Sequence, residues 1–126
     1  MLLLDSGGVT RLAVRSRQVA ALILELRARD LWPPLVPSVV LVECLQGHAA
    51  FDAHANALLK TCDIVEEVPE YVARRAAFLR RKARRGSAVD ALLVAFAEPD
   101  GTVLTGDPGE LAALAQFAGR VRVERI

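Results

Sequence analysis

The sequence is poor in aromatic residues and in cysteine, and it contains no long apolar run. Aromatic residues make up 5% of the 126 residues, and the two cysteines, Cys44 and Cys62, lack the spacing of a metal site. We therefore expect reduced thiols in a reducing compartment. No apolar run approaches the ~20 residues that span a bilayer, and the N-terminus lacks the features of a secretory signal. These absences predict a cytoplasmic protein without a membrane segment.

Two nucleotide-binding signatures are also missing. The first apolar segment is not followed by G-x-G-x-x-G, and no P-loop occurs anywhere in the chain. Both absences argue against a nucleotide-binding module. A haloacid-dehalogenase-like phosphatase would need a second aspartate two residues after Asp5, where this chain has Gly7.

Short apolar segments alternate with helical patterns from end to end, which predicts one α/β domain over residues 1–126. Because the strands are continuously apolar, we expect a short central parallel sheet between two helical layers, a three-layer, Rossmann-like α/β/α fold. A turn is expected at Ser6-Gly7-Gly8, and one or two helical turns at 9–14. The predicted strands are 1–4, 35–37, 63–66, 102–105 and 121–123, and the predicted longer helices are 17–29, 38–47, 49–60 (with Phe51 inward), 70–85, 88–97 and 108–117.

Four carboxylates stand at the edges of apolar segments: Asp5, Glu43, Asp90 and Asp107. Burying an unpaired charge is expensive, so four such placements suggest one shared site that binds something positive. Asp5 and Asp107 follow predicted strands, and ligands bind parallel sheets at the carboxyl ends of their strands. Oxygen ligands without a nearby histidine or cysteine favour Mg²⁺ or Mn²⁺ over Zn²⁺.

Each of these acids also has an ordinary structural interpretation. Asp5 can bond the amides of a turn, Asp90 can lie in the first turn of a helix, and Asp107 can cap the helix that follows it. Glu43 is the hardest to explain in this way, because it lies within a predicted apolar helix. Glu110 is expected either to complete a capping box or to lie at the rim of the site.

Four segments together resemble the PIN-domain family, and most closely its VapC-type toxins from toxin–antitoxin pairs. In that family an aspartate closes the first strand, a glutamate lies in the helix after the second strand, a third acid opens a helix, and a fourth follows a strand ending in Thr-x-Asp. The chain departs from the family at Gly7-Gly8, where a bulkier residue is common. The matching segments are LLLDSGGVTRL at 2–12, PSVVLVECLQG at 37–47, GSAVDALLVAFA at 86–97 and TVLTGDPGEL at 102–111.

The resemblance implies a PIN-like fold and a Mg²⁺- or Mn²⁺-dependent endoribonuclease that cuts a cellular RNA by metal-assisted phosphodiester hydrolysis. Asp5, Glu43, Asp90 and Asp107 match the family's metal-site acids, and Ser6 and Thr105 match hydroxyl residues beside them. These hydroxyls are expected to hydrogen-bond the carboxylates or a metal-bound water. The resemblance also implies a cognate antitoxin that blocks the site, a homodimer, and larger toxin–antitoxin assemblies. The alternative is an inactive PIN-like module that only binds RNA or a partner protein.

A basic stripe precedes Asp90 in the sequence. Residues 74–85 contain seven arginines and lysines and no acid, although the net charge of the whole chain is only +1. We expect Arg80, Arg81, Arg84 and Arg85, with Lys82 between them, to hold RNA phosphates near the metal. The alternatives are a solvated helix face or a surface that meets a partner.

Overall fold

The computed structural model describes all 126 residues, which form five strands and seven helices. The strands are β1 (Leu2–Leu4), β2 (Leu35–Pro37), β3 (Asp63–Val65), β4 (Thr102–Thr105) and β5 (Arg122–Arg125). The helices are α1 (Ser6–Leu12), α2 (Arg17–Ala28), α3 (Ser38–Cys44), α4 (Ala53–Leu59), α5 (Glu70–Ala83), α6 (Ala88–Ala97) and α7 (Gly109–Ala115).

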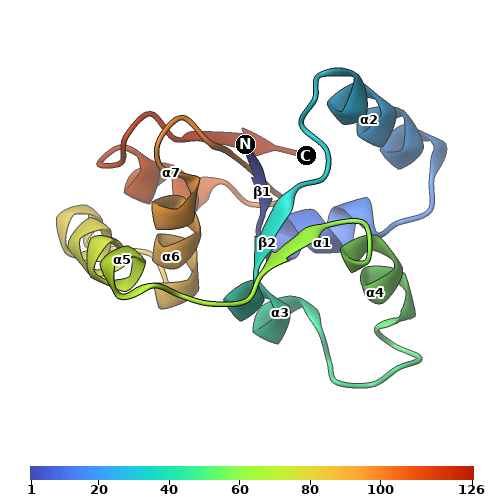
Figure 1. The fold of residues 1–126 in the computed structure, drawn as a ribbon, viewed down its shortest axis with the longest axis horizontal. Helices are drawn as coiled ribbons and strands as arrows, with labels where there is room; N and C mark the ends of the chain where they lie inside the picture. Colours follow the sequence, from blue (N-terminus) through green and yellow to red (C-terminus); the bar gives the residue numbers. More distant parts are fainter.

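The strands form one all-parallel sheet in the order β3-β2-β1-β4-β5 (Figure 1). The predicted α/β class with a central parallel sheet is therefore confirmed. The chain starts at the central strand β1, adds β2 and β3 on one side, and then crosses to the other side of β1 to add β4 and β5. The direction of winding thus reverses between β1 and β4. In open parallel sheets, ligands bind beyond the carboxyl ends of the strands at such a reversal.

Helices cover both faces of the sheet and complete the three layers. On one side α1 packs against α3 and α4, and on the other α5, α6 and α7 pack against one another. Helices α1 and α6 both contact β1 and β4, from opposite faces (Figure 1). The helix α2 stands apart from both groups and buries only Leu26. None of the seven helices has the length and apolar character needed to span a membrane.

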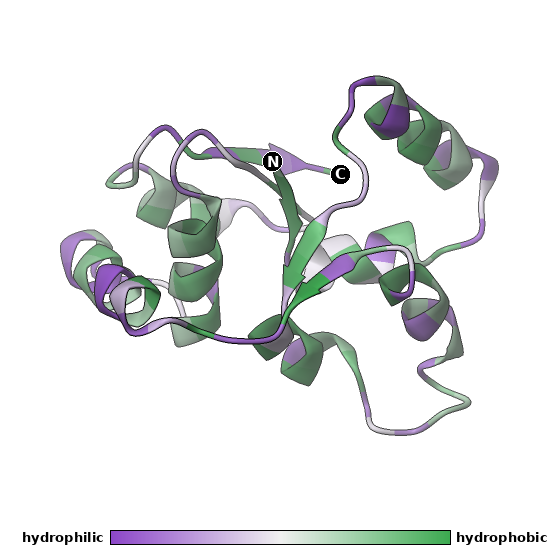
Figure 2. Cartoon of the chain, viewed as in Figure 1, coloured by the Kyte–Doolittle hydropathy of each residue, from purple (hydrophilic) through white to green (hydrophobic).

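The core is built around β1 and α6. All three residues of β1 are buried, and α6 buries residues around most of its circumference because the sheet lies on one side of it and α5 and α7 on the other. Figure 2 shows the apolar character of both elements, against the hydrophilic outer surface of α5. Each buried Leu or Val side chain stabilises the fold by about 1.5–3 kcal/mol. The core therefore rigidly positions the two elements that end or begin beside Asp5 and Asp90.

Helix α1 begins earlier than the sequence suggests. The predicted turn at residues 6–8 is wrong, because Gly7 and Gly8 lie inside the helix that Asp5 caps. Both glycines permit a close approach to β4. A Cβ atom on Gly8 would lie 2.5 Å from the carbonyl oxygen of Leu104, and one on Gly7 would lie 3.2 Å from the backbone nitrogen of Gly106. The glycine pair therefore lets the start of α1 press against the end of β4.

The segment between β2 and β3 is less helical than predicted. Helix α3 ends at Cys44 rather than near Gly47, so Glu43 lies at its exposed end and not within a buried helix. The following helix α4 covers residues 53–59 instead of 49–60. The prediction that Phe51 points inward is wrong, because this residue lies in the preceding turn and is 70% exposed. Only Val40 of α3 is buried, so most of this apolar run does not belong to the core.

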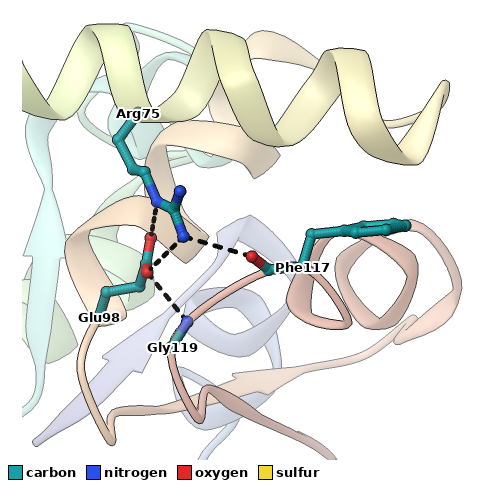
Figure 3. Close-up of polar contacts among 4 residues, drawn as sticks. All are labelled: Arg75, Glu98, Phe117 and Gly119. Carbon is teal, nitrogen blue, oxygen red and sulfur yellow. Dashed lines mark hydrogen bonds and ion pairs between the residues drawn. The ribbon is translucent and has the colours of Figure 1, made fainter.

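An ion pair joins α5 to the end of α6 (Figure 3). Arg75 donates from Nε to Oε1 of Glu98 at 2.8 Å and from Nη2 to Oε2 at 3.0 Å. The same Nη2 donates to the carbonyl of Phe117 at 3.3 Å, and Oε2 of Glu98 also accepts the backbone N–H of Gly119 at 2.9 Å. The hydrogen bonds from Arg75 are the main reason that the pKa of Glu98 is lowered. One arginine of the basic stripe therefore has a structural role.

The close approach at Gly8 gives the first prediction. In an exposed helix, Gly→Ala stabilises by up to about 1 kcal/mol, but Gly8→Ala should destabilise by about 1–3 kcal/mol because the added methyl meets the Leu104 carbonyl. The control is Gly109→Ala, where the added Cβ would meet only Oδ1 of Asp107 at an ordinary 3.5 Å. Urea unfolding of both variants measures the difference. A Gly8→Ala protein as stable as the Gly109→Ala protein would contradict this packing.

The ion pair in Figure 3 gives the second prediction. Arg75→Ala should lower the free energy of unfolding by about 1–2 kcal/mol, because it leaves the partly buried Glu98 with only one hydrogen bond. Arg74→Ala should cost less than about 0.5 kcal/mol, because Arg74 pairs with Glu70 on the exposed surface of the same helix. Equal losses in the two variants, measured by chemical denaturation, would show that Arg75 is an ordinary surface residue.

Candidate functional site

The site is centred where β1 and β4 end. Asp5 follows β1 directly and caps α1, accepting the backbone N–H of Gly8 on Oδ1 at 2.6 Å. Its other oxygen, Oδ2, accepts a short hydrogen bond from the hydroxyl of Thr105, the last residue of β4. Thr105 is fully buried, and its Oγ1 also accepts the backbone N–H of Asp107 at 3.0 Å. The ends of the two central strands are thus joined through one carboxylate.

Glu43 and Asp90 come to the same edge from two helices. Helix α3 and the first turn of α6 both lie at the carboxyl end of the sheet (Figure 1). Partial burial raises the pKa of the Glu43 carboxyl, and the negative charges of Asp90 and Asp5 raise it further. Burial likewise raises the pKa of Asp90, against hydrogen bonding by Ser87, and the charges of Asp5 and Glu110 add to this effect. Asp5, Glu43 and Asp90 are therefore close enough to repel one another.

Asp107 and Glu110 both lie at the edge of this group. The Asp107 side chain is exposed and accepts the backbone N–H of Gly109 at 3.3 Å, and its charge is not among those that raise the pKa of Glu43 or Asp90. Pro108 rather than Asp107 precedes α7, and no side chain caps that helix, so the capping-box alternative for Glu110 is wrong. The exposed Glu110 is instead near enough for its charge to add to the raised pKa of Asp90, as expected of a residue at the rim of the acidic group.

The two hydroxyl residues differ in what they do. Thr105 donates to Asp5, as described above. Ser6 is the first residue of α1, and only its backbone carbonyl forms a hydrogen bond, accepting the hydroxyl of Thr10 at 2.9 Å. The Ser6 side chain therefore does not orient a carboxylate in this structure.

The carboxylates at this edge of the sheet are chemically suited to a hard divalent cation. Every ionisable group that converges here is a carboxylate, and their mutual repulsion would be relieved by positive charge. The structure contains no group of three or more histidine, cysteine or acidic side chains that could hold a metal ion. Mg²⁺ is usually held by one or two carboxylates and keeps several waters, so it needs fewer protein ligands than Zn²⁺, which takes a tetrahedral set.

The basic stripe divides into paired and unpaired residues. Arg74 and Arg75 pair with acids, and Arg80 donates to the carbonyl of Gly86 at 3.2 Å. The remaining members have no carboxylate partner, and they cluster at the turn between α5 and α6, five to nine residues before Asp90. Together with Arg80 and Gly86 they line an open hollow of about 820 Å³ that contains no apolar residue. The unpaired members are Arg81, Lys82, Arg84 and Arg85.

No pattern in the sequence predicts the order in the loop after α3. Asp52 is only 5% exposed, and its carboxylate accepts the backbone N–H groups of Gln46, Gly47 and His48 at 2.9, 2.9 and 3.1 Å. These bonds lower the pKa of Asp52, with the bond from Gln46 contributing most. An acid that lies four to six residues after the backbone N–H groups it accepts does not match a recognised sequence motif. Its role becomes visible only once the loop is folded.

Neither a protein-family model nor a curated protein matches this sequence. The function is therefore inferred from the arrangement of the residues at the sheet edge. That arrangement gathers carboxylates at one edge of the sheet, and it places an exposed basic surface at the turn that leads into α6.

The third prediction concerns the pH dependence of stability. Because folding raises the pKa of Asp90, the folded protein holds a proton that the unfolded chain has lost. The stabilisation from this proton is complete below the ordinary aspartate pKa of about 3.9 and disappears as the pH rises through the folded value. The free energy of unfolding of the wild type, measured without divalent ions, should therefore fall relative to that of Asp90→Asn as the pH rises toward 7. Parallel stability curves for the two proteins would contradict the burial of the Asp90 carboxyl, which is the main cause of its raised pKa.

Proposed function

We propose that this protein is a divalent-cation-dependent endoribonuclease of the PIN-domain type, acting as the toxin of a toxin–antitoxin pair. The observation that carries the proposal is the convergence of Asp5, Glu43 and Asp90 at the winding reversal of a parallel sheet. Such a reversal is where ligands bind in this class of fold. Three acids held there against their mutual repulsion are difficult to explain by stability alone.

The resemblance in the sequence supports the same proposal. The acids that match the PIN-domain pattern are Asp5, Glu43, Asp90 and Asp107, and three of them are the ones whose charges interact. The parallel sheet and its helical layers are compatible with the family's fold. The glycine pair at residues 7–8, where this chain departs from the pattern, lies within α1 and leaves Asp5 at the helix start.

Each acid has a distinct part in the proposed chemistry. Asp5 and Asp90 would hold a Mg²⁺ or Mn²⁺ ion, with Glu43 and Asp107 as further ligands or as acceptors for its waters. When bound, the ion would orient a phosphate, acidify an attacking water and stabilise the leaving oxygen. Thr105 fixes the Asp5 carboxylate in one orientation through its hydrogen bond. The raised pKa of Glu43 suits a residue that takes a proton from water.

The basic hollow at the α5–α6 turn supports nucleic acid as the substrate. An RNA strand carries one negative charge per nucleotide, and phosphate contacts supply much of the affinity of proteins for nucleic acid. Arg81, Lys82, Arg84 and Arg85 are free to make such contacts, because no carboxylate neutralises them. They lie just before α6 in the chain, so a strand held there would be led toward Asp90.

Uncovered apolar surface around α2 supports a protein partner. Leu24 of this helix is 66% exposed, and a hollow of about 540 Å³ beside it is lined mainly by apolar side chains, including Val14, Val19 and Ile23. Exposed apolar surface is common where proteins contact other proteins. A cognate antitoxin, or a second copy of the chain in a homodimer, would cover it.

The fourth prediction tests the nuclease directly. Brief expression of the wild type should arrest growth and produce discrete cuts in total RNA, mapped by sequencing of the new RNA ends. Asp90→Ala should lower the cleavage rate by at least about 100-fold, because it removes a carboxylate from the cation site. Asp63→Ala is the matched control, since this exposed acid begins β3 at the opposite end of the parallel sheet.

Two outcomes would overturn the proposed activity. If the purified wild type cuts no RNA with either Mg²⁺ or Mn²⁺, the chain is not a nuclease, and retained RNA binding would then favour the alternative of an inactive binding module. If Asp90→Ala and Asp63→Ala both cut as well as the wild type, the cleavage does not depend on the acidic group.

A further inference from the structure

Phe51 presents an uncovered ring beside the acidic group. It is 70% exposed, in the turn before α4, although most apolar side chains of this size are at least partly covered. Its ring packs on that of His48, with 4.5 Å between the centroids and a tilt of 37°. His48 is itself exposed. The two rings therefore form an aromatic surface that faces solvent.

The loop that carries this surface is held in place. Asp52, immediately after Phe51, is buried and accepts three backbone N–H groups from residues 46–48. The backbone N–H of Asp52 in turn donates to the carbonyl of His48 at 2.9 Å. These four hydrogen bonds fix the loop on both sides of the aromatic pair. A ring that is ordered before binding loses less conformational entropy when a ligand stacks on it.

Phe51 and Glu43 line the same hollow, which has a volume of about 380 Å³. Thr10 of α1 and Gln46 also line it, so hydrogen-bonding groups lie near the ring. The hollow is open to an uncharged, planar group with a polar edge. An anion is disfavoured there because Glu43 contributes negative charge, and a purely apolar group would leave the polar lining unmatched.

We propose that Phe51, supported by His48, stacks a base of single-stranded RNA next to the nucleotide that is cut. This inference rests on the proposed function, since a base can occupy this hollow usefully only if the neighbouring phosphate lies at the acidic group. The basic turn lies between α5 and α6, whose first turn carries Asp90, and the aromatic hollow follows α3 and is lined in part by Glu43. An RNA strand would thus be held by its phosphates at the basic turn and by a base at the aromatic hollow. Unpaired bases are commonly bound by stacking on aromatic side chains.

The fifth prediction measures this contact on the intact chain. The probe is a short single-stranded oligoadenylate that contains 2-aminopurine, with Ca²⁺ in place of Mg²⁺ to limit cleavage. Binding is followed by fluorescence anisotropy, and stacking by quenching of the 2-aminopurine. Phe51→Ala should weaken binding by about 5- to 100-fold and abolish the quenching, whereas Phe51→Tyr should preserve both. Tyr71→Ala is the control, because Tyr71 is 76% exposed at the start of α5, far along the helix from the basic turn.

The outcomes separate this contact from the proposed activity. If the wild type cuts RNA but Phe51→Ala binds the probe as tightly and quenches it as fully, the stacking contact is wrong and the nuclease stands. If Phe51→Ala dissociates a dimer in sedimentation experiments without changing RNA binding, a second copy covers the ring, and the proposal is also wrong. If the wild type neither binds nor cuts RNA, the proposed function and the stacking contact fall together.

Discussion

The parallel pairing of β1 with β4 is the constraint on which the candidate site depends. It brings Asp5, which follows one strand, within hydrogen-bonding distance of Thr105, which ends the other, although the two are 100 residues apart. The pairing also sets the packing of α1, whose Gly8 lies against the carbonyl of Leu104. A larger residue there would push α1 away and move Asp5 with it. The buried sheet and the start of α1 therefore form one rigid support for the acid.

Charge is distributed unevenly around this support. Acids gather at the carboxyl edge of the sheet, where burial and mutual repulsion raise the pKa values of Glu43 and Asp90. Unpaired basic residues gather at the turn that leads into α6, while Arg75 of α5 is bound to Glu98 at the opposite end of α6. The proposed phosphodiester substrate would suit both surfaces, because its negative oxygens would contact the basic residues and the cation that we propose between the acids. The nearly neutral net charge conceals this separation.

The sequence predicted the α/β class, the parallel sheet and most of the strands, because short apolar runs between helical patterns have few other solutions. It was less informative wherever long-range contacts decide local structure. Nothing local shows that Gly8 meets Leu104, so residues 6–8 resembled a turn. Glu43 looked enclosed by core because Val42, which is 82% exposed, resembles a core residue in an apolar run. The exposure of Phe51 was missed for a related reason, since the loop that carries it is closed by hydrogen bonds from backbone N–H groups to the carboxylate of Asp52.

The central claim is that the converging carboxylates bind a divalent cation, and calorimetric titration of the purified protein with Mn²⁺ and Mg²⁺ tests it most directly. Asp5→Asn keeps the size of the side chain that caps α1 but removes its charge, and Asp63→Asn is the control at the opposite end of the sheet. The structure predicts saturable binding by the wild type and by Asp63→Asn, and greatly weakened binding by Asp5→Asn. A wild type that binds neither ion, or an Asp5→Asn protein that binds as tightly as the wild type, would contradict the claim.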